Sequence, residues 1–145
     1  MVTLEIGGEK KQYSFGTSFE KIAAEYQEQE KDEIVLVLYN NRLRELNKKA
    51  EKDGTLTFIT AADNTGKKTY RRSATLLMQK AVFNLWGDAH ISVRVMYSIS
   101  QSYYCELIRR EEGKQETVPF DENKAKELKE EMDRLVAADI PIEKW

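Results

Sequence analysis

Apolar and polar residues alternate along the first fifteen positions of the chain. The apolar residues at positions 2, 4 and 6 point to one face of a strand, the glycines at 7 and 8 supply a turn, and Tyr13 and Phe15 share one face of a returning segment, residues 11–15. A period of two on both sides of a two-residue glycine turn is typical of a β-hairpin. The chain is therefore predicted to open with a short hairpin.

A helix is predicted after this hairpin. Thr17 and Glu20 have the spacing of a capping box, in which a hydroxyl and a carboxylate satisfy the free N–H groups of a first helical turn. Apolar residues then recur at the helical spacing of three and four, at Phe19, Ile22, Ala23 and Tyr26. The pattern predicts a helix of about three turns that buries one face.

Strand patterns return in residues 34–38, 42–46 and 55–60, and the polar residues 47–53 between them tolerate a helix. Asn40 and Asn41 suit the positive φ angles of a tight turn. Two strands, a helix and further strands predict a β-grasp-like module over residues 1–62. Residues 61–68 are poor in apolar groups and contain a turn-like Asp-Asn-Thr-Gly sequence, so the domain boundary is predicted there.

Residues 63–145 are predicted to form a second, small α+β domain. A helical stripe covers residues 74–85 and Gly87 is placed to end it. From His90 the period changes to two, with the odd residues 91–99 on one face, and residues 103–108 supply an antiparallel partner in which Cys105 is a core residue. A polar loop over residues 111–115 then leads to a helix with Asp121 as N-cap. An apolar segment barely begins before Trp145, which predicts a domain that is incomplete at its C-terminal end.

Composition excludes several function classes. Charged residues make up 33% of the chain with a net charge of −2, which gives no overall attraction to nucleic acid or to an anionic membrane. The apolar runs fall far short of the roughly 20 residues that cross a bilayer, and the prediction is a cytoplasmic protein without membrane association. One cysteine and one histidine cannot form a disulfide or a Cys/His zinc site, and the Gly-Lys-Lys-Thr sequence at 66–69 lacks the earlier glycine of a phosphate-binding P-loop.

Two groups of basic residues are candidates for binding phosphates. Lys67, Lys68, Arg71 and Arg72 stand at the predicted boundary beside Tyr70, which could stack on a base. A second group lies in the first module, at Arg42, Arg44, Lys48 and Lys49. Both groups predict a nucleotide or RNA ligand. The alternative is that they are ordinary solvated surface side chains.

Two blocks of sequence resemble known domains. Residues 16–23 and 34–46 are similar to the TGS domain, a β-grasp module of threonyl-tRNA synthetases, certain GTPases and stringent-response enzymes. Residues 71–82, with later likenesses at Trp86-Gly87 and Tyr103-Tyr104, resemble the second additional domain of threonyl- and alanyl-tRNA synthetases. The same pair of domains precedes the kinase domain in bacterial uridine kinase-like nucleoside kinases. This second family is the preferred match because of residues 68–73 and of the substitutions described next.

The resemblance to the synthetases implies an editing site that this chain has altered. In that family, two histidines one helical turn apart carry the editing chemistry. Alignment by the following Leu-Leu pair places Arg71 and Thr75 there, and alignment by the serine after the first histidine places Arg72 and Leu76 there. A guanidinium neither ligates zinc nor acts as a base at neutral pH. The chain is therefore predicted to hold no catalytic residue and no metal, and not to deacylate tRNA.

Three functions are compatible with these observations. The preferred hypothesis is a non-catalytic recognition or regulatory region attached to a C-terminal nucleoside kinase domain. In this hypothesis ATP and magnesium bind to the kinase domain, and this chain binds no cofactor. The alternative is the N-terminal part of a threonyl-tRNA synthetase-like protein involved in aminoacyl-tRNA editing. A third is a free-standing module that binds RNA or a nucleotide.

Overall fold

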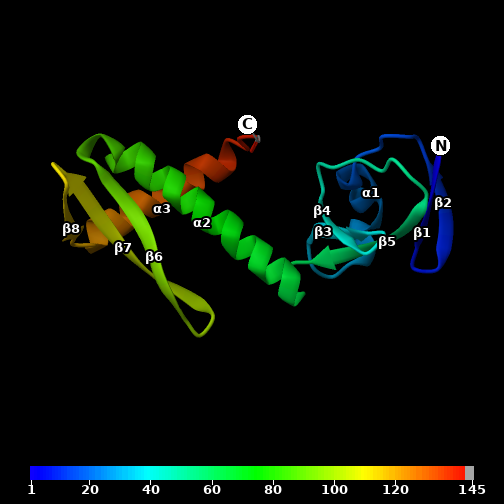
Figure 1. Cartoon of the computed structure of the whole chain (residues 1–145), viewed down its shortest axis with the longest axis horizontal. Helices are drawn as coiled ribbons and strands as arrows, with labels where there is room; N and C mark the ends of the chain where they lie inside the picture. Colours follow the sequence, from blue (N-terminus) through cyan, green and yellow to red (C-terminus); the bar gives the residue numbers. More distant parts are fainter. Residues whose placement is uncertain (143–145) are drawn as a thin grey trace. The chain divides into compact units, whose positions relative to one another are not determined.

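The computed structural model describes residues 1–142 and divides the chain into two compact units, Met1–Arg72 and Ser73–Trp145 (Figure 1). The division falls within helix α2 (Asn64–Trp86), ten residues after the boundary at 62/63 that the sequence suggests. Each unit combines helix and sheet, so the chain is a mixed α+β protein.

The first unit is a five-stranded mixed sheet with one α-helix packed on it. Its strands stand in the order β2-β1-β5-β3-β4, with β1 parallel to β5 and the other neighbours antiparallel. The elements in chain order are β1 (Val2–Ile6), β2 (Glu9–Tyr13), α1 (Phe19–Tyr26), the 3₁₀ turn η1 (Gln27–Gln29), β3 (Ile34–Tyr39), β4 (Arg42–Glu45) and β5 (Gly54–Thr60).

The core of the first unit lies between α1 and this sheet. Leu4, Phe19, Ile22, Val37 and Leu56 are at most 2% exposed. Each of these side chains contributes roughly 1.5–3 kcal/mol by leaving water. The alternation and the helical spacing in the sequence therefore identify the side chains that hold this unit together.

Two local expectations for the first unit, the cap of its helix and the place of Phe15, are wrong. The N-cap of α1 is Ser18, whose hydroxyl accepts a hydrogen bond from the Lys21 amide, while the Thr17 hydroxyl donates to the Ser14 carbonyl. Phe15 lies beyond the end of β2 and is 68% exposed, so it does not share the buried face of Tyr13. Residues 46–53 form a loop with no helical turn.

Helix α2 begins inside residues 61–68, where the sequence predicts the domain boundary. The Asp63 carboxylate accepts hydrogen bonds from the amide and the hydroxyl of Thr60, and the Ala61 amide donates to the Glu33 carbonyl. Gly66 is buried against the end of β5, where a Cβ atom would overlap the Thr60 carbonyl oxygen. The glycine is therefore needed for close packing. Within residues 1–142, no helix has both the length and the apolar character required to cross a membrane.

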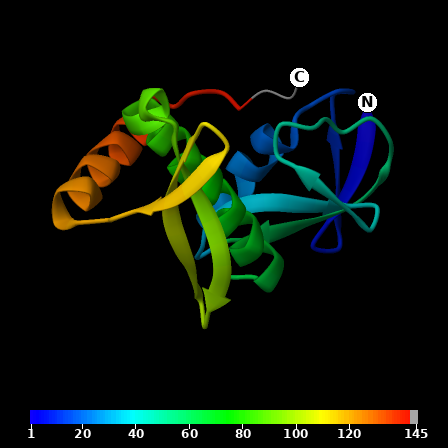
Figure 2. The same cartoon turned by 60° about the vertical axis from the view of Figure 1, so that its left-hand side comes forward.

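The second unit packs two helices on one face of a three-stranded antiparallel sheet (Figures 1 and 2). Its elements after α2 are the 3₁₀ turn η2 (Gly87–Ala89), β6 (Ile91–Ile99), β7 (Ser102–Glu111), β8 (Lys114–Val118) and α3 (Glu122–Ala137). The core is smaller than that of the first unit and is built from Val82, Ile91 and Leu107, with Trp86 and Leu128 packed against it. Cys105 is half-buried on β7, and burial raises the pKa of its thiol.

Two strand expectations for this unit are corrected by the structure. Residues 111–115 are not a polar loop, because β7 continues to Glu111 and a tight turn at Glu112 and Gly113, both with positive φ, leads into β8. The pairing of β6 with β7 shifts register between Val95 and Tyr97. Side chains alternate along a strand, so one extra residue moves every later side chain to the opposite face. Tyr97 therefore does not share the face of Val95.

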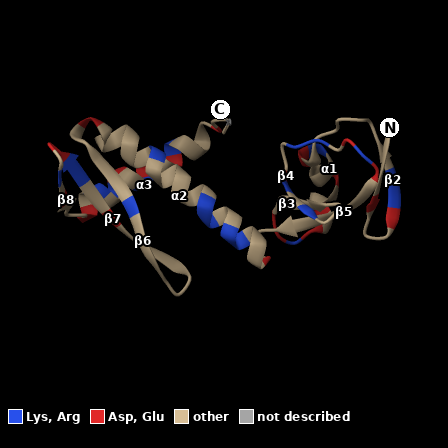
Figure 3. Cartoon of the chain, in the orientation of Figure 1, with Lys and Arg blue, Asp and Glu red and all other residues tan. Residues whose placement is uncertain are grey.

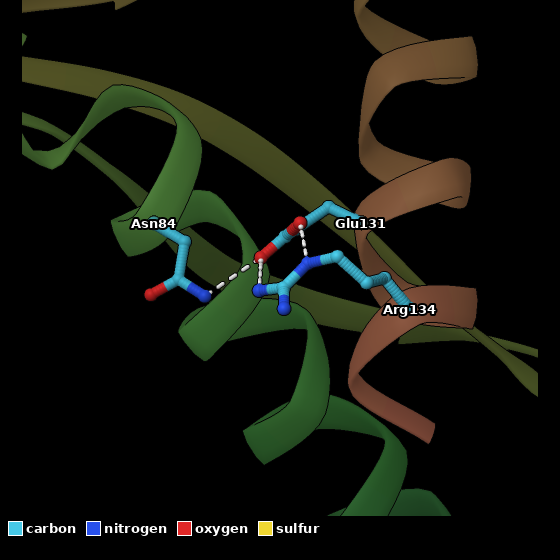
Figure 4. Close-up of polar contacts among 3 residues, drawn as sticks. All are labelled: Asn84, Glu131 and Arg134. Atoms are coloured by element: carbon cyan, nitrogen blue, oxygen red, sulfur yellow. Dashed lines mark hydrogen bonds and ion pairs between the residues drawn. The ribbon is translucent and has the colours of Figure 1, made fainter. Parts of the chain in front are cut away.

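Asp121 is the N-cap of α3, as the sequence predicts, and accepts a hydrogen bond from the Lys124 amide at 2.9 Å. A polar contact between side chains also joins α2 to α3 within this unit (Figure 4). The Glu131 carboxylate accepts hydrogen bonds from the Arg134 guanidinium and, at 2.7 Å, from the side-chain nitrogen of Asn84. These donors lower the pKa of Glu131 to about 2, Arg134 having the larger effect.

Candidate functional site

A hollow of about 590 Å³ on the first unit gathers all five basic residues of β4 and of the loop that follows it. We call it the cation pocket. It is lined by Tyr39, Asn40, Arg42, Arg44, Lys48, Lys49, Glu51 and Lys52. Five of these eight residues are cationic and one is anionic, although the chain as a whole carries a net charge of −2. The pocket is thus a local concentration of positive charge.

The β3–β4 hairpin positions the two arginines. Asn40 and Asn41 have φ angles of 49° and 61°, which form the two-residue turn that the sequence predicts between paired residues Tyr39 and Arg42. Asparagine tolerates these angles better than most residues do. Arg42 and Arg44 follow two apart on the exposed edge strand, so both side chains leave from the same face of the sheet.

The loop of residues 46–53 is held in place by the first turn of α1. The amides of Phe19 and Glu20 donate to the carbonyls of Lys48 and Leu46, each at 2.8 Å. Ala50 is fully buried, and its amide donates to the Thr17 carbonyl. These bonds fix the backbone of the loop that presents the three lysines of the pocket.

Tyr39 and Asn40 connect the two walls of the pocket. The Tyr39 hydroxyl donates to the Lys52 carbonyl at 2.5 Å and accepts from the Lys52 amide at 2.9 Å, while its ring lies 5.1 Å from the buried ring of Phe19. The Asn40 side chain accepts from the Thr55 amide and donates to the Asp53 carbonyl. The pocket is therefore built from fixed backbone rather than from a flexible chain.

The five cations of the pocket outnumber its one carboxylate, Glu51. Within residues 1–142, ion pairs join other residues, and none includes one of the five pocket cations. Like charges that share a hollow repel one another, and an anion that enters relieves this repulsion. Such a site suits a ligand with several negative charges, and lysine and arginine are the residues that proteins use to contact phosphate.

The structure separates the two basic groups that the sequence identifies. Arg42 and Arg44 join Lys48 and Lys49 in the cation pocket, whereas Lys67, Lys68, Tyr70, Arg71 and Arg72 lie on the first half of α2 and do not line it. Figure 3 shows the α2 cations as blue bands in the N-terminal half of the helix. Tyr70 is 61% exposed. Sequence reasoning missed Lys52, Tyr39 and Asn40, because no local pattern indicates that the loop closes against β3.

The two positions that alignment by the Leu-Leu pair would equate with the editing histidines lie one helical turn apart on α2, as do Arg72 and Leu76 of the alternative alignment. The first pair is Arg71, which is half-buried, and Thr75. Residues 1–142 contain no group of three or more His, Cys, Asp or Glu side chains arranged to hold a metal ion. Arg71 and Thr75 supply a cation and a hydroxyl at these two positions.

Comparison with curated proteins finds threonine--tRNA ligases, with the match in their N-terminal region. The ligase of Caldanaerobacter subterraneus is 25% identical over 95% of this chain, that of Syntrophotalea carbinolica 26% over 99%, and that of Symbiobacterium thermophilum 30% over 71%. The chain covers 20%, 22% and 14% of these proteins, so it spans about a fifth or less of the length of the relatives it matches.

No family model matches the chain. Among solved structures, a chain in the crystal structure of ATBAG1 in complex with HSP70 aligns with a TM-score of 0.37 and 11% identity over 61% of this chain and 56% of that one. A similarity at this level supports no inference about fold or function. The sequence similarity to threonine--tRNA ligases is thus the finding that bears on function.

Proposed function

We propose that this chain is a tRNA-binding region without editing activity, similar to the N-terminal region of threonyl-tRNA synthetases, and that the cation pocket is where tRNA phosphates bind. The carrying observation is the set of five clustered cations with no ion pair in the described part of the chain. Each relative is a threonine--tRNA ligase, a protein whose name states that it acts on tRNA. A polyanionic RNA backbone matches the charge that the pocket concentrates.

The proposal treats the first unit as a TGS-like β-grasp module and the second as part of an editing-like domain. It takes from the alternative hypothesis the synthetase-like identity but not the role in editing, because the relatives are tRNA ligases and give no support to an attached nucleoside kinase. In this proposal the chain binds tRNA, and catalysis belongs to another domain of the protein.

The proposal excludes editing because of the side chains on α2. Arg71 carries a charge at all physiological pH values and cannot accept a proton or coordinate zinc. Thr75 offers a hydroxyl, which is a poor general base. A tRNA bound by this chain is therefore held and not hydrolysed.

Two charge-matched variants test the binding site. Each replaces four exposed cations by glutamine, so that both have the same net charge. The pocket variant carries the substitutions Arg42→Gln, Arg44→Gln, Lys48→Gln and Lys49→Gln. The control variant carries Lys10→Gln, Lys21→Gln, Lys31→Gln and Lys114→Gln, at exposed positions outside the cation pocket and outside the ion pairs described.

Fluorescence anisotropy with labelled tRNA measures the affinity of each form. If each lost phosphate contact is worth about 0.5–1 kcal/mol, the pocket variant should bind roughly 30- to 1,000-fold more weakly than the wild type. The control variant should lose much less. Equal losses in the two variants would show that binding follows net charge and not the pocket.

Hydrolysis of aminoacyl-tRNA tests the second half of the proposal. The purified chain should release no amino acid above the uncatalysed rate, with or without added zinc. Metal-dependent deacylation would contradict it and would favour a role in editing.

A further inference from the structure

The sheet of the second unit has one face that neither of its helices covers (Figures 1 and 2). Helices α2 and α3 pack on the face that carries Val93 and Leu107. Side chains alternate along a strand and directly paired residues share a face, so Arg94, which follows Val93, points to the other one. We call this the outer sheet face. Its charged and aromatic residues are Arg94, Tyr97, Tyr104, Glu106 and Arg110.

Tyr97 and Tyr104 form a stacked pair with free ring surface. Their ring centroids lie 5.0 Å apart with an angle of 20° between the ring planes, and the two residues are 56% and 41% exposed. Each ring uses one of its sides for the other ring. Strand β6 forms an edge of the sheet in residues 1–142, so no neighbouring strand lies beside Tyr97 on that side. A planar aromatic ligand can therefore continue the stack on Tyr97.

The guanidinium of Arg94 has a donor that the protein does not use. Within residues 1–142, the buried Nε of Arg94 has no hydrogen-bond partner, and no ion pair includes Arg94 or Arg110. Glu106 is the one carboxylate of the outer sheet face as the structure describes it, and its negative charge raises the pKa of Tyr104. Two arginines against one carboxylate leave this face with a positive charge.

These groups match the chemistry of an unpaired nucleotide. Proteins bind single-stranded RNA by stacking its bases on aromatic rings, and arginine donates hydrogen bonds to the acceptor atoms that bases carry. Bases inside a duplex are stacked on one another, so only an unpaired base can lie on Tyr97. A second copy of the chain is a poor match, because it would bring the same arginines and the same positive charge against this face.

We propose that the outer sheet face binds an unpaired nucleotide of RNA, with the base stacked on Tyr97 and the Arg94 guanidinium donating to it. The inference rests on the proposed function for the class of ligand and adds a second site, in the other unit. This site differs from the helix positions equated with the editing histidines, because α2 packs on the opposite face of the sheet. Every base has an aromatic face, so the site should favour a base over its absence without requiring one sequence.

The test compares labelled oligo(A) with an abasic strand of the same phosphate number by fluorescence anisotropy. The pocket variant of the full chain serves as the background, because strands held at the cation pocket would mask a second site. In this background oligo(A) should bind about 5- to 150-fold more tightly than the abasic strand, which is the contribution of one stacked base.

Four substitutions in the same background assign this preference to its residues. Tyr97→Leu should abolish the preference and leave the affinity for the abasic strand unchanged, while Tyr97→Phe keeps the ring and should keep the preference. Arg94→Gln should weaken the binding of oligo(A) more than that of the abasic strand. The matched control is Tyr103→Leu, at a tyrosine of the same hairpin that is 42% exposed and lies on the other face, and it should leave both affinities unchanged.

Either of two results would overturn the inference and leave the proposed function intact. One is equal binding or no binding of the two strands, or a preference that survives in Tyr97→Leu. The other is a dimer of the wild-type chain in sedimentation that Tyr97→Leu dissociates, because a second copy would then cover this face. Conversely, equal losses of tRNA binding in the pocket and control variants would refute the proposed function, while a base preference that depends on Tyr97 would still support the site.

Discussion

The hydroxyl of Tyr39 is expected to hold the two walls of the cation pocket together, and Tyr39→Phe tests this directly. The substitution removes two hydrogen bonds to Lys52, one donated at 2.5 Å and one accepted at 2.9 Å. The ring remains, so its packing 5.1 Å from Phe19 is kept and no cavity forms. The effect therefore isolates the hydroxyl.

The magnitude follows from what Lys52 loses. A neutral hydrogen bond contributes about 0.5–1.5 kcal/mol net, and the Lys52 backbone can bond to water in the variant because this residue is exposed. Tyr39→Phe should lower the free energy of unfolding of the first unit by about 1–2 kcal/mol. It should also weaken tRNA binding, since the loop carrying the pocket lysines loses one of its attachments.

Amide hydrogen exchange at Val37 and Leu56 measures the stability of the first unit within the whole chain, because both residues are buried in its sheet. Tyr70→Phe is the matched control for stability, at a tyrosine that is 61% exposed on α2, and should leave these exchange rates unchanged. Equal exchange in wild type and Tyr39→Phe would refute the view that this hydroxyl stabilises the pocket.

Three further outcomes are expected. Gly54→Ala should destabilise the first unit by about 1–2 kcal/mol in urea unfolding, because the new Cβ overlaps the Asn40 side chain and displaces its hydrogen bonds; an unchanged midpoint would contradict this. The pKa of Glu131 is about 2 in the folded chain and 4.5 when unperturbed. The stabilisation that the ionised Glu131 carboxylate gives should therefore be complete above about pH 4.5 and disappear as the pH falls toward 2. A titration of the carboxyl groups followed by NMR measures this pKa. Replacing Arg71 and Thr75 by histidine should create weak zinc binding detectable by calorimetry, since the two positions lie one helical turn apart. Equally strong zinc binding by the wild-type chain would contradict the view that Arg71 and Thr75 do not bind the metal.

The spacing of apolar residues predicts those strands and helices that bury one face and expose the other. The alternation at residues 2–6 and the helical spacing from Phe19 each identify side chains that the structure buries. Strand β8 was missed because it is an edge strand with four of its five residues exposed, so no apolar alternation marks it. The register shift after Val95 adds a residue without interrupting the apolar pattern, and the sequence gives no sign of it.

The start of α2 illustrates how a turn-like composition can mislead. Asp63 and Gly66 favour a linker when local propensity alone is considered. In the structure the aspartate carboxylate binds Thr60, and the glycine allows the helix to approach the Thr60 carbonyl. Both residues serve tertiary contacts that propensity does not register.

The candidate site could be predicted in part. Arg42, Arg44, Lys48 and Lys49 are close in sequence, so their charge is visible as a cluster. Lys52 enters the pocket only because the loop returns to Tyr39, which depends on hydrogen bonds between residues thirteen positions apart.

The salt dependence of tRNA binding tests the central claim most directly. In a plot of log affinity against log salt concentration, each neutralised phosphate adds about −0.7 to −0.9 to the slope. Five pocket contacts therefore give a slope of about −3.5 to −4.5. The pocket variant, which retains Lys52, should fall to about −0.7 to −0.9, while the control variant keeps the wild-type slope. Identical slopes for the two variants would contradict the account.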